Sequence, residues 1–193
     1  MFKQVTTAFF VLTFAIAPTI SHAQRSFCEL ETQDWSDEID DLLVGTWEVQ
    51  NGPGLASVGG VPVPLPPDSV GQMTIEKIGS ELTAIGKGAE LAADFSVDYV
   101  PDEVWDFKKL IDFDDDPPYI SLEDAATTFD QDCPSALPRI RFSASIPIQG
   151  GNLMITMDMV VVGETTLFGV SDFVLTAGGP VMVAQRSMVF AKN

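Results

Sequence analysis

Hydrophobic and polar residues alternate along most of the chain from residue 44 onward. In the segment 139–149, Ile140, Phe142 and Ala144 would point to one side and the residues between them to the other. A period of two is typical of a half-buried β-strand, and short glycine-containing runs separate such segments as hairpin turns would. The expected strands are 44–50, 70–78, 81–87, 90–99, 139–149, 152–162, 165–177 and 181–192.

Eight consecutive antiparallel strands favour a closed barrel, because closure leaves no exposed sheet edge. We therefore expect an all-β fold, an eight-stranded antiparallel up-and-down barrel, as a single domain over 44–193. Residues 58–67 are rich in Gly and Pro and are predicted to form a long loop. Residues 101–133 are predicted to be an acidic, partly helical insertion. An acidic N-terminal segment, 24–43, precedes the barrel, and 35–43 is a candidate helix within it.

The first 23 residues have the pattern of a secretory signal peptide. A basic start at Lys3 is followed by an apolar run over 8–17, then Pro18 and the small residues of Ser21-His22-Ala23. This pattern predicts cleavage after Ala23 and an exported protein, periplasmic or secreted. The alternative is a membrane anchor, but a spanning helix needs about 20 apolar residues.

Export changes the expected state of the two cysteines, Cys28 and Cys133. An oxidising compartment favours a disulfide between them, which would close a loop of 133 − 28 = 105 residues. The alternative is two free thiols. Because the two cysteines lie so far apart in the sequence, a bridge would have a structural role.

Residue composition removes several classes of function. Cleavage of the signal peptide would remove His22, the only histidine, which excludes Ser–His or Cys–His catalysis and His-ligated zinc. A formal charge of −18 argues against nucleic acid as a partner, because phosphate binding needs clustered Lys and Arg. The chain has no Gly-x-Gly-x-x-Gly or P-loop pattern for a nucleotide, so we expect no enzyme activity and no cofactor of that kind.

Two short motifs at the ends of the barrel segment carry a resemblance to a known family. Gly45-x-Trp47 opens the first expected strand, and Arg186 lies on the last one. Together with eight strands, this resembles the lipocalin-like, or calycin, proteins. The resemblance implies that Arg186 packs across Trp47 at the closed end of the barrel, as a cation–π pair. The family's second motif is not visible around 162–164. The alternative is an ordinary core tryptophan and a surface arginine.

The acidic residues are concentrated in two stretches. Of the 28 acids, seven lie in 29–41 and twelve in 98–132. Within the second stretch, Asp112, Asp114, Asp116 and Glu123 have the spacing of ligands in an EF-hand calcium loop, but Pro117 stands where that loop needs glycine. Calcium binding at these residues or at a looser site is therefore one hypothesis. A solvated acidic surface is the other.

The function predicted from these observations is non-catalytic binding of a small apolar or amphipathic molecule inside the barrel. Methionines on the strands would suit an adaptable pocket, although they also fill ordinary cores. They are Met154, Met157, Met159, Met182 and Met188. The alternatives are a protein-interaction module, such as a protease inhibitor that binds through its N-terminal segment and the loop 58–67, and an acidic calcium-responsive module. An enzyme that uses carboxylates is the least favoured.

Overall fold

The computed structural model describes residues 27–88, 93–101, 133 and 136–192. Two short 3-10 helices, η1 and η2, precede the helix α1, and nine strands follow in the described residues. Their bounds are η1 Phe27–Glu29, η2 Thr32–Asp34, α1 Trp35–Leu43, β1 Gly45–Val58, β2 Val61–Leu65, β3 Asp68–Ile78, β4 Glu81–Gly88, β5 Ala93–Tyr99, β6 Arg139–Ile148, β7 Gly151–Gly163, β8 Thr166–Thr176 and β9 Met182–Lys192.

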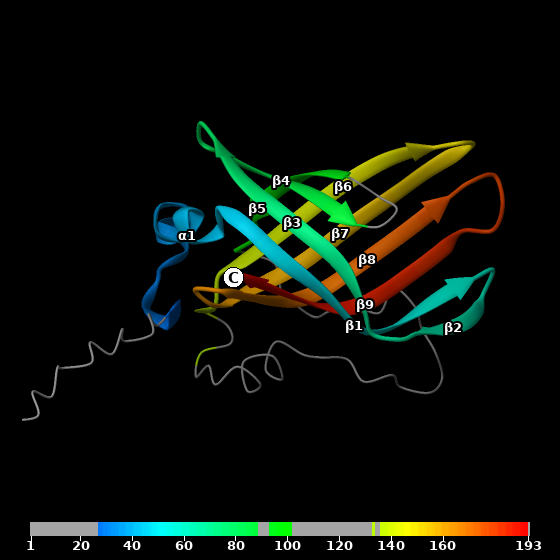
Figure 1. Cartoon of the computed structure of the whole chain (residues 1–193), viewed down its shortest axis with the longest axis horizontal. Coiled ribbons are helices and arrows are strands. Elements are labelled where there is room, and N and C mark those ends of the chain that lie inside the picture. Colours follow the sequence, from blue (N-terminus) through cyan, green and yellow to red (C-terminus); the bar gives the residue numbers. More distant parts are fainter. Residues whose placement is uncertain (1–26, 89–92, 102–132, 134–135, 193) are drawn as a thin grey trace, which may run out of the picture.

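Eight of these strands form a closed antiparallel barrel (Figure 1). Each of β3 to β8 pairs with the next strand in the chain, and β1 pairs with both β3 and β9, so the sheet returns to its first strand. Closure pairs the edges that would otherwise be exposed. The predicted all-β, eight-stranded antiparallel barrel is confirmed.

The alternation of the sequence sets which side chains fill the barrel. On β6 the buried residues Ile140, Phe142 and Ala144 alternate with more exposed ones, and on β9 Met188 and Phe190 occupy the inward row. Residues directly opposite in the register share a face of the sheet, so each strand's inward row meets that of its neighbour. The inward rows of the strands form one apolar core.

The prediction of a long loop over 58–67 is wrong. β1 extends to Val58 and turns through Gly59 and Gly60 into β2, which makes a β-hairpin. Both glycines have positive φ, +60° and +85°, as a tight two-residue hairpin turn requires. The prolines of the sequence Val-Pro-Val-Pro-Leu are tolerated because β2 lies at the end of the strand order, where an edge strand needs no donors on its outer side.

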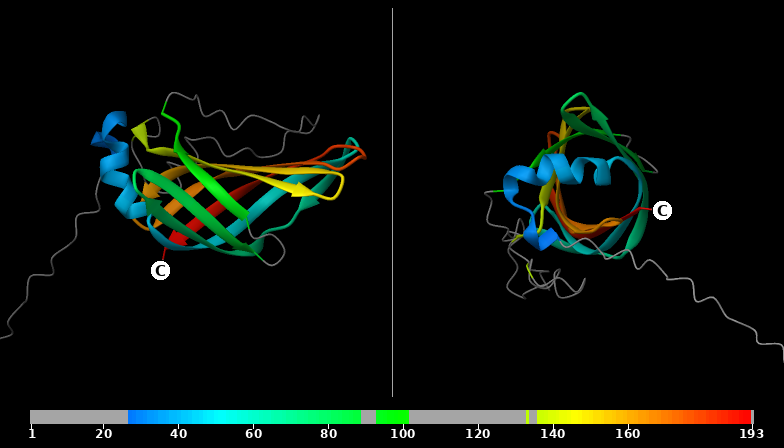
Figure 2. Two further views of the ribbon diagram at one scale, coloured as in Figure 1. Left: turned by 90° about the horizontal axis from the view of Figure 1, so that it is seen from above. Right: turned by 90° about the vertical axis from the view of Figure 1, so that its left-hand side faces the viewer.

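The helix α1 lies across one end of the barrel (Figure 2, right). Trp35, Ile39 and Leu43 are spaced four residues apart, so they share one helix face, and all three are buried in the core. We call this the closed end. The hairpins β1–β2, β6–β7 and β8–β9 extend at the opposite end, which we call the open end (Figures 1 and 2).

The candidate helix at 35–43 is thus confirmed as α1. The predicted signal peptide and residues 102–132 of the predicted insertion lie outside the described residues. Over the part of the chain that the structure describes, no helix has the length and apolar character needed to span a membrane.

Candidate functional site

The closed end is held together around Trp47. Its indole Nε1 donates a hydrogen bond to Leu43 O at 2.7 Å, and the Lys192 ammonium lies 5.5 Å from the ring centroid. Lys192 Nζ also donates to Leu42 O at 2.9 Å and to Val44 O at 2.7 Å. The last carbonyls of a helix lack intrahelical partners and carry partial negative charge. Trp47 and Lys192 therefore fasten the C-terminal end of α1 to the barrel.

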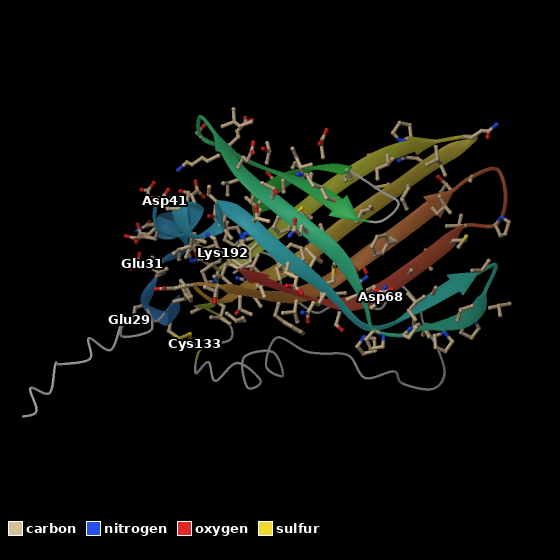
Figure 3. All side chains as sticks on the ribbon, in the orientation of Figure 1. Glu29, Glu31, Asp41, Asp68, Cys133 and Lys192 are labelled. Atoms are coloured by element: carbon tan, nitrogen blue, oxygen red, sulfur yellow. A yellow bond between two sulfur atoms is a disulfide. The ribbon has the colours of Figure 1, made fainter. Side chains whose placement is uncertain are left out.

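The cation on Trp47 is therefore Lys192, and the structure differs from the expected Arg186–Trp47 pair. In the β1–β9 register Trp47 lies opposite Lys192, whereas Arg186 lies opposite Gly54. The two cations are six residues apart on β9, about 20 Å along a strand. Both belong to the same alternate row, so only the register decides which one reaches the tryptophan. In Figure 3 Lys192 lies toward α1, well away from Asp68, a partner of Arg186.

The Gly45-x-Trp47 motif has a local physical reason. Gly45 has a φ of +136°, a conformation that side chains rarely adopt, and a Cβ atom there would lie 2.9 Å from Lys192 Cε. Glycine at this position therefore lets the lysine side chain cross the start of β1 and reach the helix end.

A buried carboxylate forms a second link between α1 and the barrel. Asp40 is 4% exposed; it accepts a hydrogen bond from the Tyr99 hydroxyl at 2.7 Å and pairs with Lys77 Nζ at 3.0 Å. Burial and the nearby carboxylate raise the pKa of Tyr99, and the hydrogen bond to Asp40 raises the pKa of Lys77. The tyrosine therefore stays a donor and the lysine stays charged. Because all three have complementary partners, we interpret this cluster as structural.

The predicted Cys28–Cys133 disulfide is present, with a Cα–Cα distance of 5.5 Å. It joins the segment before α1 to the chain that leads into β6 (Figure 3). Next to this region lies a cleft of about 400 Å³, lined by Leu30, Glu31, Thr32, Gln33, Trp35, Ala136 and Arg139. The Arg139 guanidinium lies 6.0 Å from the Trp35 ring centroid.

The open end presents apolar side chains to solvent. Val58 is opposite Val61 on β2 and opposite Met182 on β9, and Val63 is opposite Ala56, so these residues share the inward face. Val61 is 62% exposed and Val63 43%, and Val58 and Met182 are also exposed. We define these four residues, Val58, Val61, Val63 and Met182, as the apolar rim. Leu175 of β8 lies opposite Met182, and Leu175, Phe173 of β8 and Ile146 of β6 are half-buried and pack against the core.

A polar cluster lies one step deeper than the rim. On the inward row of β9, Met182 and Ala184 are followed by Arg186, whose side chain is 10% exposed. Arg186 Nη2 lies 3.3 Å from Asp68 Oδ1 and donates to Pro66 O at 2.8 Å; Nε and Nη2 both donate to Gly52 O. Burial lowers the pKa of Arg186, and the Asp68 carboxylate opposes that effect. The positive charge of Arg186 is therefore balanced by Asp68, and its Nε and Nη2 atoms already have acceptors.

An irregularity in β1 creates this cluster. The register with β9 shifts between Asn51 and Gly54, as at a β-bulge, and the carbonyls of Gly52 and Pro53 accept hydrogen bonds from Arg186 and Ser187. Asn51 lies beside the bulge, opposite Asp68 on β3 and opposite Met188 on β9, and its Nδ2 donates to Asp68 Oδ1 at 2.9 Å. Asn51 is 9% exposed, and its Oδ1 is buried without a hydrogen-bond donor among the described residues.

The outer wall of the barrel carries one further unusual carboxyl group. Asp172 of β8 accepts a hydrogen bond from Gln185 Nε2 at 2.8 Å, and Asp158 lies on the neighbouring strand, paired with Arg141 at 2.6 Å. Burial raises the pKa of Asp172 to about 6, with a smaller contribution from Asp158, while Gln185 and Arg141 lower it. This group faces away from the rim.

The methionines and calcium ligands proposed from the sequence lie in different parts of the molecule or outside the described residues. Met157, Met159 and Met188 are buried in the core, Met182 belongs to the rim, and Met154 is exposed on the outer face. The candidate calcium ligands Asp112, Asp114, Asp116 and Glu123 lie outside the described residues. Within the described ranges, no group of three or more His, Cys, Asp or Glu side chains could hold a metal ion.

Sequence reasoning missed Lys192, Asn51 and Asp68. Lys192 could have been found, because it shares the alternate row of Arg186 on the expected last strand. The roles of Asn51 and Asp68 depend on the bulge at Gly52 and Pro53, and the Gly-Pro-Gly run in that segment was the only sign of it.

Comparisons with known proteins add little to this picture. Neither a protein-family model nor a curated protein matches the chain. A solved structure that is similar, an S-type phycobiliprotein lyase from Guillardia theta, is 11% identical, and the match covers 85% of this chain and 98% of that one. Its TM-score is 0.26, so the likeness carries no argument about function.

Proposed function

We propose that this protein is an exported, non-catalytic binding protein whose lipocalin-like barrel holds a small apolar or amphipathic molecule at its open end. The observation that carries the proposal is the apolar rim, in which Val58, Val61, Val63 and Met182 expose apolar side chains on the face that elsewhere forms the core. Exposed apolar surface gathered in one place is a common mark of a binding site.

The contrast between the two ends supports this location. The closed end is covered by α1 and fastened by Trp47 and Lys192, so a ligand entering the barrel there would have to displace packed structure. Toward the open end the exposure of the inward-facing side chains increases, from buried Ile155 on β7 through half-buried Phe173 on β8 to exposed Val61 on β2. A molecule resting on this gradient would bury apolar side chains without unfolding any element.

Binding of N-phenyl-1-naphthylamine, a neutral probe that fluoresces in apolar surroundings, tests the proposal. We expect the purified protein to bind the probe, and Val61→Ser with Val63→Ser to weaken binding severalfold. Both valines are exposed on an edge strand, so these changes should leave the free energy of unfolding nearly unchanged.

Met154→Ser is the matched control. Met154 is 53% exposed near the same end, but it lies on the outer face of β7. Probe binding that is unaffected by the β2 variant, or equally weakened by Met154→Ser, would contradict a site at the rim.

A further inference from the structure

Resting on the proposed function, we infer that the ligand carries a neutral hydrogen-bond donor, such as a hydroxyl group, and that this group binds Asn51 Oδ1 while the apolar part lies against the rim.

Asn51 carries an acceptor without a partner among the described residues. Asn51 Oδ1 is buried and receives no donor from the described residues, although Nδ2 of the same amide is bound to Asp68. A buried acceptor without a donor costs free energy that a bound donor would recover. A hydroxyl or amide N–H on a ligand supplies such a donor; an ether or a carboxylate does not.

The charges around Asn51 disfavour an anionic ligand group. Arg186 is the cation of this inward row that lies nearer the rim, and a ligand carboxylate would ordinarily pair with it. Here Asp68 already provides the negative charge at 3.3 Å, and the carbonyls of Gly52 and Pro66 occupy Nε and Nη2. A second carboxylate would lie beside Asp68 and a bare amide oxygen, both of which repel it. The electrostatics therefore favour a neutral group.

The rim and Asn51 lie within reach of one short molecule. On β9 the inward row runs from Met182 at the rim through Ala184 and Arg186 to Met188, which lies opposite Asn51. Val63 of the rim lies opposite Ala56, which pairs with Ala184, and from Ala184 to Met188 is four residues, about 13 Å along the strand. An amphipathic molecule with a decyl-sized apolar part can therefore contact the rim with one end and reach the polar cluster with the other.

Three compounds of one chain length separate the possibilities when each displaces N-phenyl-1-naphthylamine at pH 8. They are 1-decanol, which has the donor, decyl methyl ether, which lacks it, and decanoate, which is ionised. We expect 1-decanol to bind about three- to tenfold tighter than the ether, the range that one hydrogen bond supplies. Decanoate should bind more weakly than 1-decanol.

Two variants test the assignment to Asn51. Asn51→Leu keeps the number and branching of the side-chain heavy atoms and removes the acceptor, so the alcohol and the ether should bind equally well. Asp68→Asn leaves the acceptor and removes the counter-charge of Arg186, so decanoate should gain severalfold while 1-decanol changes little. Since Asp68 is 61% exposed, this second variant should fold even if Asn51→Leu does not.

Each outcome has one meaning. Equal binding of the alcohol and the ether to the unaltered protein, or tighter binding of decanoate, overturns the inference and leaves the proposed function standing. An alcohol preference that survives in folded Asn51→Leu also overturns it. If the probe and all three compounds fail to bind, the proposed function itself fails.

Discussion

The two ends of the barrel use the same kinds of residue for different purposes. At the closed end Trp47 is buried beneath α1, Lys192 is half-buried beside the helix, and Asp40 is buried on the helix itself; the polar atoms of these three side chains have partners, whereas Trp35 Nε1 of α1 has none among the described residues. At the open end an arginine, a carboxylate and an amide lie below exposed valines, and one amide oxygen has no donor among the described residues. A cluster whose polar atoms are satisfied stabilises the fold, whereas an unsatisfied one beside exposed apolar surface points to a ligand.

The largest expected difference between the ends is in stability. Trp47→Ala should lower the free energy of unfolding by about 3–5 kcal/mol, because Trp47 is 1% exposed and holds Leu43 O. Val63→Ala at the rim should cost less than about 1 kcal/mol, because the side chain is already 43% exposed. Urea unfolding measures both. Similar losses would mean that the rim is part of the core.

The disulfide should contribute to the closed end. Replacing Cys28 and Cys133 together by serine should cost about 2–5 kcal/mol, because the bridge restricts a loop of 105 residues in the unfolded chain. Thiol labelling of the unfolded, unreduced protein should find no reactive thiol. Where the double variant remains folded, we expect binding of the naphthylamine probe at the rim to persist. Loss of that binding would show that the two ends are coupled.

A comparison of the two cations on β9 tests the register. Lys192→Met should cost about 1–2 kcal/mol and change the near-ultraviolet circular dichroism of tryptophan, because the lysine lies over Trp47 and holds two carbonyls of the α1 end. Arg186→Met should leave that spectrum unchanged, even if its stability falls through the loss of partners for Gly52 and Pro66. A spectral change in the arginine variant alone would reverse the assignment.

The smallest expected effect concerns one carboxyl group, Asp172 on the outer wall of the barrel. Burial of Asp172 raises its pKa from 3.8 to about 6. Between these values the folded protein binds the proton more readily than the unfolded chain. The contribution of Asp172 to stability therefore falls as the pH rises from about 4 to 6.

Asp172→Asn should accordingly stabilise the protein by about 1 kcal/mol at pH 8, a figure reduced for the partial exposure of the group. The gain should disappear near pH 4, and unfolding curves at the two pH values measure it. A gain of equal size at both pH values would mean that ionisation of Asp172 is not its cause.

Local pattern was sufficient for most of the barrel. The expected strands 139–149, 152–162 and 181–192 match β6, β7 and β9 closely, because period-two alternation reports burial on one face wherever the opposite face meets solvent. The alternation did not predict the strand within 58–67, because the apolar residues of Val-Pro-Val-Pro-Leu alternate with prolines. Those prolines weaken the expectation of a strand unless the strand lies at an edge, and position in the sheet is not visible in the sequence.

For the candidate site, too, local pattern predicted one part and the tertiary structure decided the other. The sequence alone determined the inward row of β9, because alternation places Arg186 and Lys192 on the same face as Met188 and Phe190. Which cation contacts Trp47 was decided only by the tertiary structure. The β1–β9 register and the bulge after Asn51 depend on pairing between two strands that lie far apart in the sequence. A shift of register moves every partner along the strand, and no local interaction records it.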